Sequence, residues 1–217
     1  MPLFILLGVL ALALLGLFSR FPRAERAATI LTGVAFFMAL SACFLPIPEG
    51  TALGLQWGEE SFLFATVVCF ISLVIQAYSL RHFDGHRFRR RTFRYLVGLT
   101  LTLLVFSSAD HLLVLAGGLT LSNYQLARLI AHQPDWGAAR ASGRLAWRHL
   151  GLAGGLLFLA AGMIYAIQGH LSLQQLTVTW TATSWLPPAG AAIIIGALLP
   201  SAIWPLHRWL IASANAA

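Results

Sequence analysis

The sequence is too apolar and too poor in charge for a soluble protein. Hydrophobic residues make up 59% of its 217 positions, charged residues only 10%, and the mean hydropathy is +0.79. A soluble fold of this length would expose large apolar patches, which excludes one or two water-soluble domains. The composition therefore predicts an all-α, polytopic transmembrane helix bundle, since a helix satisfies its own backbone groups in lipid.

Six apolar runs along the chain are candidates for crossing a bilayer, whose core takes about 20 helical residues. They cover residues 3–18, 27–45, 61–80, 95–131, 150–168 and 185 to about 211. The fourth run is too long for one span and carries Ser107, Ser108, Asp110 and His111 near its middle, where a buried charge would be costly. A tight turn near Asp110 divides it, which gives seven spans in a single transmembrane domain over residues 1–217.

The arginines fall in alternate loops, as in a multi-span topology. They lie at residues 20–26, 81–94 and 140–148 and again at 208, whereas the loop after the second span carries only glutamates. Arginine-rich loops are cytoplasmic, so we expect the amino terminus outside. The net charge is +7, and the densest group of basic residues is the arginine cluster at residues 87–94. Because this cluster directly adjoins two apolar spans, membrane lipid is its expected partner and nucleic acid is not.

The first apolar run and the two cysteines are interpreted as structural. No positive segment precedes residues 3–18, as it would in a cleaved signal peptide, so this run is expected to remain as the first span. Cys43 and Cys69 lie inside predicted spans without a pairing pattern and are interpreted as small apolar side chains. Because no metal site, phosphate-binding loop or nucleophile constellation is recognisable, the chain is not expected to be an enzyme.

Few ionisable residues remain that could handle ions within the membrane. Asp110 and His111 lie at the predicted outer turn, either as a site that admits protons or as a solvated, turn-forming pair. As a turn residue, Asp110 is expected to be dispensable for folding. Arg128 and Arg148 are expected near the inner ends of the fifth and sixth spans, where they either reach the headgroups or form a charge relay.

The seventh span is expected to break at Pro200 and Pro205, because each proline lacks a backbone donor. His207 follows the break directly and is predicted to face protein or a polar cavity, with the carbonyls freed at the break as partners. The alternative is a simple proline kink at the end of a span. Histidine changes charge near neutral pH, which makes His207 the first choice for a proton-handling group. In the sixth span, Gly151 and Gly155 form a GxxxG pattern that favours close helix packing.

Several short motifs, in order along the chain, carry a family resemblance. They are YSLRHFDG at residues 78–85, FRYL at 93–96, DHLL at 110–113 and PLHRWL at 205–210. From about the second span to the end, the chain resembles the amino-terminal half of the large proton-translocating subunits of complex I and of Mrp-type antiporters. That resemblance implies a longer family fold, whose remaining helices would follow residue 217 or come from a second polypeptide.

Two departures narrow the resemblance. Thr120 stands where the complex I subunit carries a glutamate, and Pro200 stands where it carries a lysine. The run LTLSNYQLARLI at residues 119–130 and the arginine-rich stretch that follows look more like the membrane subunit of Dab-type inorganic carbon accumulation complexes. This resemblance implies cation-gradient-driven uptake of bicarbonate or CO2 and a multi-pass location in a bacterial inner membrane. It also implies a soluble, zinc-dependent, carbonic-anhydrase-like partner, with no cofactor in this chain itself.

Three functions therefore stay open at this point. The first is an energy-coupling membrane subunit for inorganic carbon uptake, which handles protons or sodium. The second is a complex I-like or Mrp-like translocator of protons or sodium, against which the missing glutamate and lysine argue. The third is a membrane anchor that conducts nothing, which the scarcity of ionisable residues in the spans favours.

Overall fold

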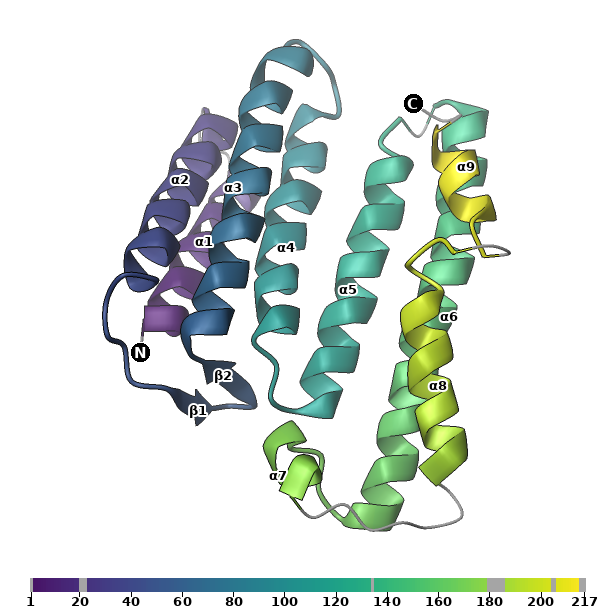
Figure 1. Ribbon diagram of the computed structural model, residues 1–217. Coiled ribbons are helices and arrows are strands. Elements are labelled where there is room, and N and C mark those ends of the chain that lie inside the picture. The colour runs from purple at the N-terminus through teal and green to yellow at the C-terminus, as the bar shows by residue number, and fades with distance from the viewer. Residues whose placement is uncertain (1, 20–22, 134, 179–185, 204–205, 215–217) are drawn as a thin grey trace. The chain divides into compact units, whose positions relative to one another are not determined.

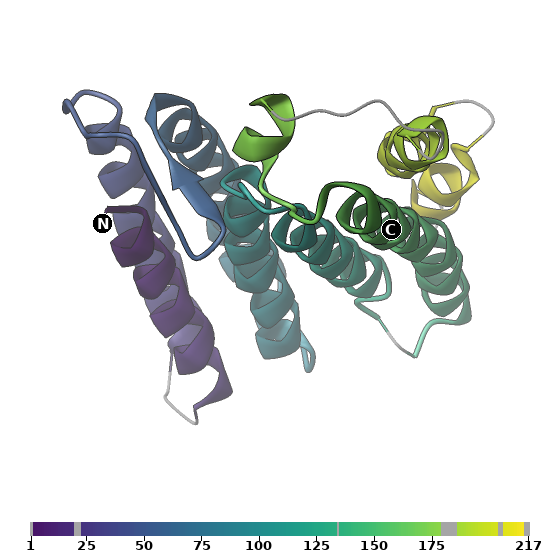
Figure 2. The same cartoon turned by 90° about the horizontal axis from the view of Figure 1, so that it is seen from below.

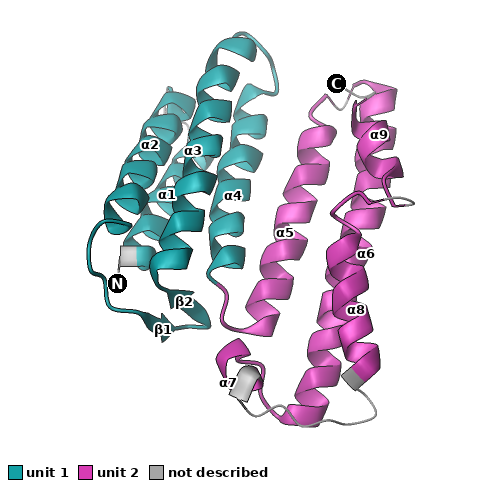
Figure 3. Cartoon of the chain, viewed as in Figure 1, with its two compact units in different colours: residues 1–108 teal, residues 109–217 magenta. Residues whose placement is uncertain are grey.

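The computed structural model describes residues 2–19, 23–133, 135–178, 186–203 and 206–214. The chain forms two compact units, Met1–Ser108 and Ala109–Ala217, which have separate colours in Figure 3. Both units are built mainly of helices (Figure 1), so the predicted all-α class is confirmed. The expectation of a single transmembrane domain stays a prediction.

Unit 1 consists of four helices and a β-hairpin. The helices are α1 (Pro2–Phe18), α2 (Ala24–Ala42), α3 (Glu59–His82) and α4 (Arg89–Ser107), and the strands β1 (Gly50–Ala52) and β2 (Leu55–Trp57) precede α3. The strands pair antiparallel, with Gly50 opposite Trp57. Leu53 and Gly54 form the turn with φ of 55° and 74°, the left-handed pair that a tight two-residue hairpin uses. The sequence predicts a loop with glutamates here and does not predict the hairpin.

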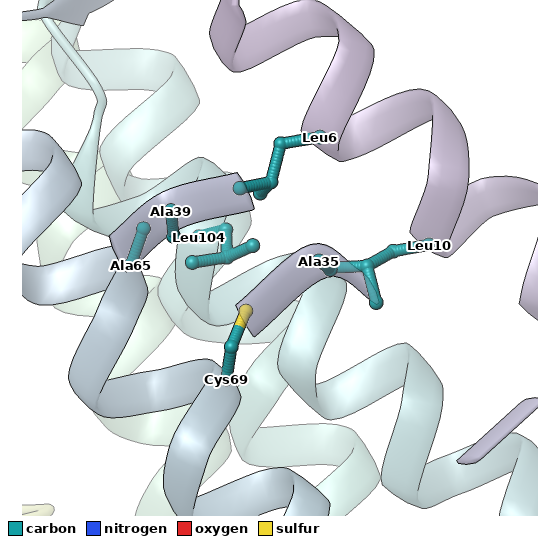
Figure 4. Close-up of a cluster of buried hydrophobic side chains, with 7 residues drawn as sticks. All are labelled: Leu6, Leu10, Ala35, Ala39, Ala65, Cys69 and Leu104. Atoms are coloured by element: carbon teal, nitrogen blue, oxygen red, sulfur yellow. The ribbon is translucent and has the colours of Figure 1, made fainter. Parts of the chain in front are cut away.

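Small residues bring the helices of unit 1 together. One buried cluster, drawn in Figure 4, joins four helices. Its members are Leu6, Leu10, Ala35, Ala39, Ala65, Cys69 and Leu104. Alanine lets helices approach closely, which matters where lipid removes the hydrophobic drive for association. Cys69 is 0% exposed in this cluster, which confirms its interpretation as a small apolar residue. By contrast, Phe64 and Tyr78 of α3 are 61% and 67% exposed, as side chains that face lipid would be.

A chain of hydrogen bonds joins α2, α3 and α4 inside this apolar unit. Thr32 Oγ1 donates to Gln76 Oε1 at 3.3 Å, and Gln76 Nε2 donates to Ser72 Oγ at 2.9 Å. The hydroxyls of Ser72 and Thr100 share a further hydrogen bond. All four side chains are buried and neutral, so no charge is buried with them. Interhelical bonds of this kind contribute about 0.6 kcal/mol each in membrane proteins.

Two arginines of α4 bind the carboxyl end of α1. Arg94 Nε donates to the carbonyl of Leu17 at 3.0 Å, and Arg90 Nη1 donates to that of Ser19 at 3.1 Å. Arg90 Nε also pairs with Glu25 of α2 at 3.3 Å. The last carbonyls of a helix lack intrahelical donors and carry the negative end of its dipole, which a guanidinium neutralises. These arginines, expected in a loop but found in the first two turns of α4, therefore hold three helices together.

Unit 2 is organised around one long helix. Its elements are α5 (Leu112–Ile130), α6 (Gly137–Gln168), α7 (Leu173–Val178), α8 (Leu186–Leu198) and α9 (Arg208–Ala214). Helices α5, α8 and α9 each pack against α6 (Figure 2). Because α4 ends at Ser107 and α5 begins at Leu112, the predicted division of the fourth apolar run near Asp110 is confirmed.

The helices match most of the predicted spans. Within the described residues, α2, α3 and α6 are long and apolar enough to cross a membrane, while Leu3–Phe18 and Pro187–Leu198 are shorter apolar helices. The number of spans and the side of the amino terminus stay predictions. The predicted start of the sixth helix at Leu150 is wrong, because α6 begins at Gly137. Hydropathy marks only the part of a helix that suits lipid, and alanine and arginine continue this helix into polar sequence.

The predicted glycine packing motif is corrected by one position. A Cβ at Gly154 would lie 2.9 Å from Thr120 Cβ of α5, and one at Gly143 would lie 2.6 Å from Ala131 Cβ. A Cβ at Gly155 would meet nothing within 4 Å, and one at Gly151 would meet only Trp147 of the same helix. Gly154 and Gly143 therefore provide the close approach of α5 and α6. The GxxxG spacing identified the right helix but the wrong face.

Candidate functional site

Asp110 holds two distant parts of unit 2 together. Its carboxylate accepts from the Ser172 hydroxyl at 3.0 Å and from Gln174 N at 3.3 Å, and its carbonyl accepts from Leu173 N at 2.6 Å. Leu112 N donates to the Leu171 carbonyl at 2.9 Å, which forms an antiparallel bridge between residues 111 and 172. The start of α5 is therefore tied to the segment that leads into α7.

The interpretation of Asp110 as a solvated residue is wrong, because it is only 8% exposed. Hydrogen bonds from a hydroxyl and an amide replace the water that its charge would otherwise need. His111 is half-buried, and its Nδ1 accepts from Leu113 N at 3.4 Å as the amino-terminal cap of α5. Both residues therefore lie at the helix turn, as expected, but Asp110 belongs to the packed interior.

We expect Asp110→Asn to lower the free energy of unfolding by about 1.5–3 kcal/mol, the range for a hydrogen bond to a charged group. This reverses the expectation that Asp110 is dispensable for folding. Amide hydrogen exchange at residues 171–175 should accelerate in the same variant. Thermal unfolding in detergent checks the first effect, with Asp84→Asn as the matched control. Asp84 is 79% exposed in its ion pair with Arg89, and an exposed pair contributes little. Equal stability of the two variants would contradict the role assigned to Asp110.

The seventh predicted span is broken, as expected from its prolines. Helix α8 ends at Leu198, and α9 begins only at Arg208. At Pro200 the α-helical hydrogen-bond pattern ends. Ser201 N donates to the carbonyl three residues earlier, that of Leu198, at 3.2 Å, as in a 3₁₀ turn. Ala202 then takes a φ of 51°, the left-handed region that ends many helices. Pro205 and the predicted first residue of the span, Trp185, lie outside the described residues.

His207 lies at the end of this break, directly before α9. Its carbonyl accepts from Leu210 N at 3.0 Å. Its ring nitrogen Nδ1 is buried against protein, with no hydrogen-bond partner in the part of the chain that the structure describes. The sequence predicts that carbonyls near the prolines accept a hydrogen bond from this ring. None of the described carbonyls is a partner of Nδ1. A buried polar atom in this state is uncommon in proteins.

Trp209, two residues further, repeats the same feature. It is 6% exposed and packs with Ala127 of α5 and with Ala146 and Leu150 of α6. Its Nε1 is also buried without an acceptor among the described residues. The start of α9 thus packs against α5 and α6 near Ala127 and Leu150. His207 and Trp209 contribute one buried nitrogen each at this place.

The two arginine candidates differ in their surroundings. The Arg128 guanidinium lies 5.9 Å from the ring centre of Tyr124, and Tyr124 contacts Trp147 edge to face at 5.4 Å. Arg128 thus joins an aromatic group between α5 and α6, which favours a fixed position over free snorkelling. Arg148 is exposed and lies well inside α6, because the helix begins at Gly137. Its predicted place at the end of the sixth helix is therefore wrong.

The candidates gather at two ends of α5 and not in one place. Asp110 and His111 precede the helix, whereas Arg128 lies in its last turn. The 19 residues of α5 span roughly 28 Å at 1.5 Å per residue. No proton can pass directly between side chains over that distance. Any ion path through unit 2 would need intermediate groups along α5.

Polar residues on α5 that the sequence reasoning passed over could supply such groups. Asn123 is 5% exposed and donates from Nδ2 to the Leu150 carbonyl of α6 at 3.0 Å. Ser122 and Gln125 are buried as well. A signal was present, since these polar residues interrupt an otherwise apolar span. Among the described residues, no three His, Cys, Asp or Glu side chains lie close enough together to hold a metal ion.

Comparison with known proteins gives consistent likenesses. A family model described as NADH:quinone oxidoreductase/Mrp antiporter, TM, matches residues 109–217, which are the residues of unit 2. A probable inorganic carbon transporter subunit DabB2 of Halothiobacillus neapolitanus is 30% identical over 181 residues, or 80% of this chain and 32% of the relative. A probable inorganic carbon transporter subunit DabB of Bacillus anthracis is 28% identical over 171 residues, or 72% of this chain and 31% of the relative.

A solved structure extends the likeness to the fold. One chain of respiratory complex I from Thermus thermophilus with bound aureothin matches with a TM-score of 0.78 at 18% identity, over 96% of this chain and 46% of that chain. At this identity the match concerns the fold alone. This chain spans about a third of the length of the curated relatives that it matches.

Proposed function

Because the chain belongs to the NADH:quinone oxidoreductase/Mrp antiporter transmembrane family, we propose that it is a membrane subunit of a complex that uses a cation gradient to take up inorganic carbon. It is a multi-pass bacterial membrane protein. In this proposal the chain handles protons or sodium ions and catalyses no covalent chemistry itself. The supporting observation is its likeness to two proteins named as inorganic carbon transporter subunits.

The packing at Thr120 supports this proposal over a complex I-like translocator. The resemblance places Thr120 where the complex I subunit carries a glutamate. Here Thr120 Oγ1 donates to the Ala116 carbonyl of its own helix at 2.7 Å, and its side chain touches Gly154 of α6. Gly154 closes the space beside this position, so a longer ionisable side chain would meet the backbone of α6. A proton path in this chain would therefore use other groups, for which Asp110 and His207 are our candidates.

Proton or sodium translocation without carbon uptake is the second candidate, and the family match over unit 2 favours it. For the carbon uptake complex we propose a soluble, zinc-dependent, carbonic-anhydrase-like partner, with the zinc in that partner. A further chain that carries the remaining helices of the family fold is also proposed. The names of the two relatives as transporter subunits support a multi-subunit membrane complex.

Accumulation of labelled bicarbonate in cells tests the function. Cells that depend on the complex should lose accumulation when this chain is deleted and regain it when the chain is restored. Accumulation should also collapse when an ionophore dissipates the coupling gradient, with proton and sodium ionophores distinguishing the ion. Two results would overturn the proposal: restoration by an unrelated membrane anchor fused to the partner, or cation transport in vesicles that is indifferent to inorganic carbon.

A further inference from the structure

An apolar groove runs between α1 and α2 in unit 1. It has a volume of about 230 Å³ and is lined by three residues of α1, by Ser19 directly after α1, and by four residues of α2. The helix residues are Leu12, Ala13 and Gly16 of α1 and Ala24, Ala27, Ala28 and Leu31 of α2. The groove exists because most of these side chains are small. A Cβ at Gly16, for example, would meet nothing within 4 Å.

The groove opens on a surface that suits lipid. Leu12 on its wall is 63% exposed, and nearby Leu15 and Ile30 are 65% and 67% exposed. In a membrane protein these side chains contact acyl chains. The groove is smaller than the pockets of about 300–1,000 Å³ that enclose drug-sized ligands, and a helix about 10 Å wide would not enter it. A single flexible hydrocarbon chain is the occupant that its size fits.

The polar end of the groove carries positive charge. Ser19 lines that end, and its carbonyl accepts from the Arg90 guanidinium at 3.1 Å. Arg23, directly before α2, and Arg26 in its first turn are both exposed. The acidic residue beside them, Glu25, is paired with Arg90 at 3.3 Å. The described end of the groove therefore keeps a net positive charge.

We propose that this groove binds one acyl chain of an anionic phospholipid, whose phosphate lies against Arg23 and Arg26. The chain itself gains little by leaving lipid for the groove, because both surroundings are apolar. Selectivity therefore has to come from the headgroup, and cationic side chains at the membrane surface attract anionic lipid. The groove fixes where that lipid sits. This inference is independent of the transported species.

Lipid retention by the purified full chain tests the proposal. The protein is reconstituted in nanodiscs of phosphatidylcholine and phosphatidylglycerol in equal amounts and then extracted in mild detergent, and native mass spectrometry counts the lipids that stay bound. We expect wild type to retain phosphatidylglycerol preferentially. Gly16→Leu fills the groove and should abolish that retained lipid. Arg23→Gln with Arg26→Gln should keep the groove but lower the preference roughly 30-fold, as expected for two surface arginines.

Matched variants separate this site from general effects. Gly8→Leu makes the same change on the same helix. A Cβ at Gly8 also meets nothing within 4 Å, but Gly8 does not line the groove. Arg81→Gln with Arg87→Gln removes the same charge from exposed residues of unit 1. Both controls should behave as wild type. Equal retention in Gly16→Leu and Gly8→Leu overturns the proposal, as does an equal loss of preference in the two arginine pairs. Retention of phosphatidylcholine in equal amount by wild type also overturns it.

Discussion

Replacing Gly154 with leucine is expected to disrupt the packing of α5 on α6 and to lower the free energy of unfolding by roughly 3 kcal/mol or more, the upper range for overpacking. A single Cβ there already lies 2.9 Å from Thr120 Cβ. Thr120 cannot move away easily, because its hydroxyl is bonded to the Ala116 carbonyl at 2.7 Å. Thermal unfolding in detergent and the yield of folded protein measure the effect.

The neighbouring glycine provides the control. Gly155 is exposed, and a Cβ there would meet nothing within 4 Å, so Gly155→Leu should be tolerated. Alanine at the two positions should give effects of opposite sign. Inside a helix, alanine is favoured over glycine by about 1 kcal/mol, so Gly155→Ala should stabilise slightly, whereas Gly154→Ala should destabilise despite that gain. If Gly154→Ala also stabilised, the close contact with Thr120 would not exist.

The second large effect is expected at His207. In His207→Gln, uptake of inorganic carbon driven by the cation gradient should fall at least roughly a hundredfold, the lower end of the effect of removing a proton-transfer group. Glutamine keeps a hydrogen-bonding side chain but cannot change its charge. The amount of assembled complex should stay unchanged, since neither the packing of Trp209 nor the bond from Leu210 N to the residue 207 carbonyl needs the imidazole. This prediction rests on the proposed function.

Uptake and assembly must be measured in the same membranes. His86→Gln is the matched control, because His86 lies exposed in the loop between α3 and α4 and should not affect uptake. Lost assembly in His207→Gln would show a structural role for the imidazole. Full uptake with normal assembly would exclude His207 from ion handling and would leave Asp110 as the remaining candidate.

Local sequence patterns predicted much of the fold. The apolar runs located the helices, the polar residues around Asp110 placed the division of the fourth run, and Pro200 indicated the break after α8. Each of these signals acts within a few residues, through transfer to lipid or through a missing backbone donor. The family motifs added the superfamily, which composition alone could not provide.

Contacts between distant segments could not be predicted in this way. Asp110 meets Ser172 across 62 positions, and nothing near Asp110 in the sequence distinguishes this buried carboxylate from a solvated one. Which face of α6 meets α5 depends on how α6 is rotated about its own axis, and the glycine spacing does not contain this information. The GxxxG pattern therefore predicted a contact at Gly155, whereas the contact lies at Gly154. The polar start of α6 carries no hydropathy signal. It is helical because of its residue preferences and its contact with α9, where Ser142 Oγ donates to the Ala212 carbonyl at 2.8 Å.

The arginine contacts at the end of α1 also constrain the order of biosynthesis. The carbonyls of Leu17 and Ser19 receive their donors from Arg94 and Arg90, which are 77 and 71 residues later in the chain. At about 5–20 residues per second, a ribosome needs roughly 4–15 s to reach them. During that interval the nascent first helix can be inserted, but water or headgroups must occupy its carboxyl end. Docking of α1 is therefore completed only after α4 has emerged, although α1 precedes the other helices of unit 1 in the chain.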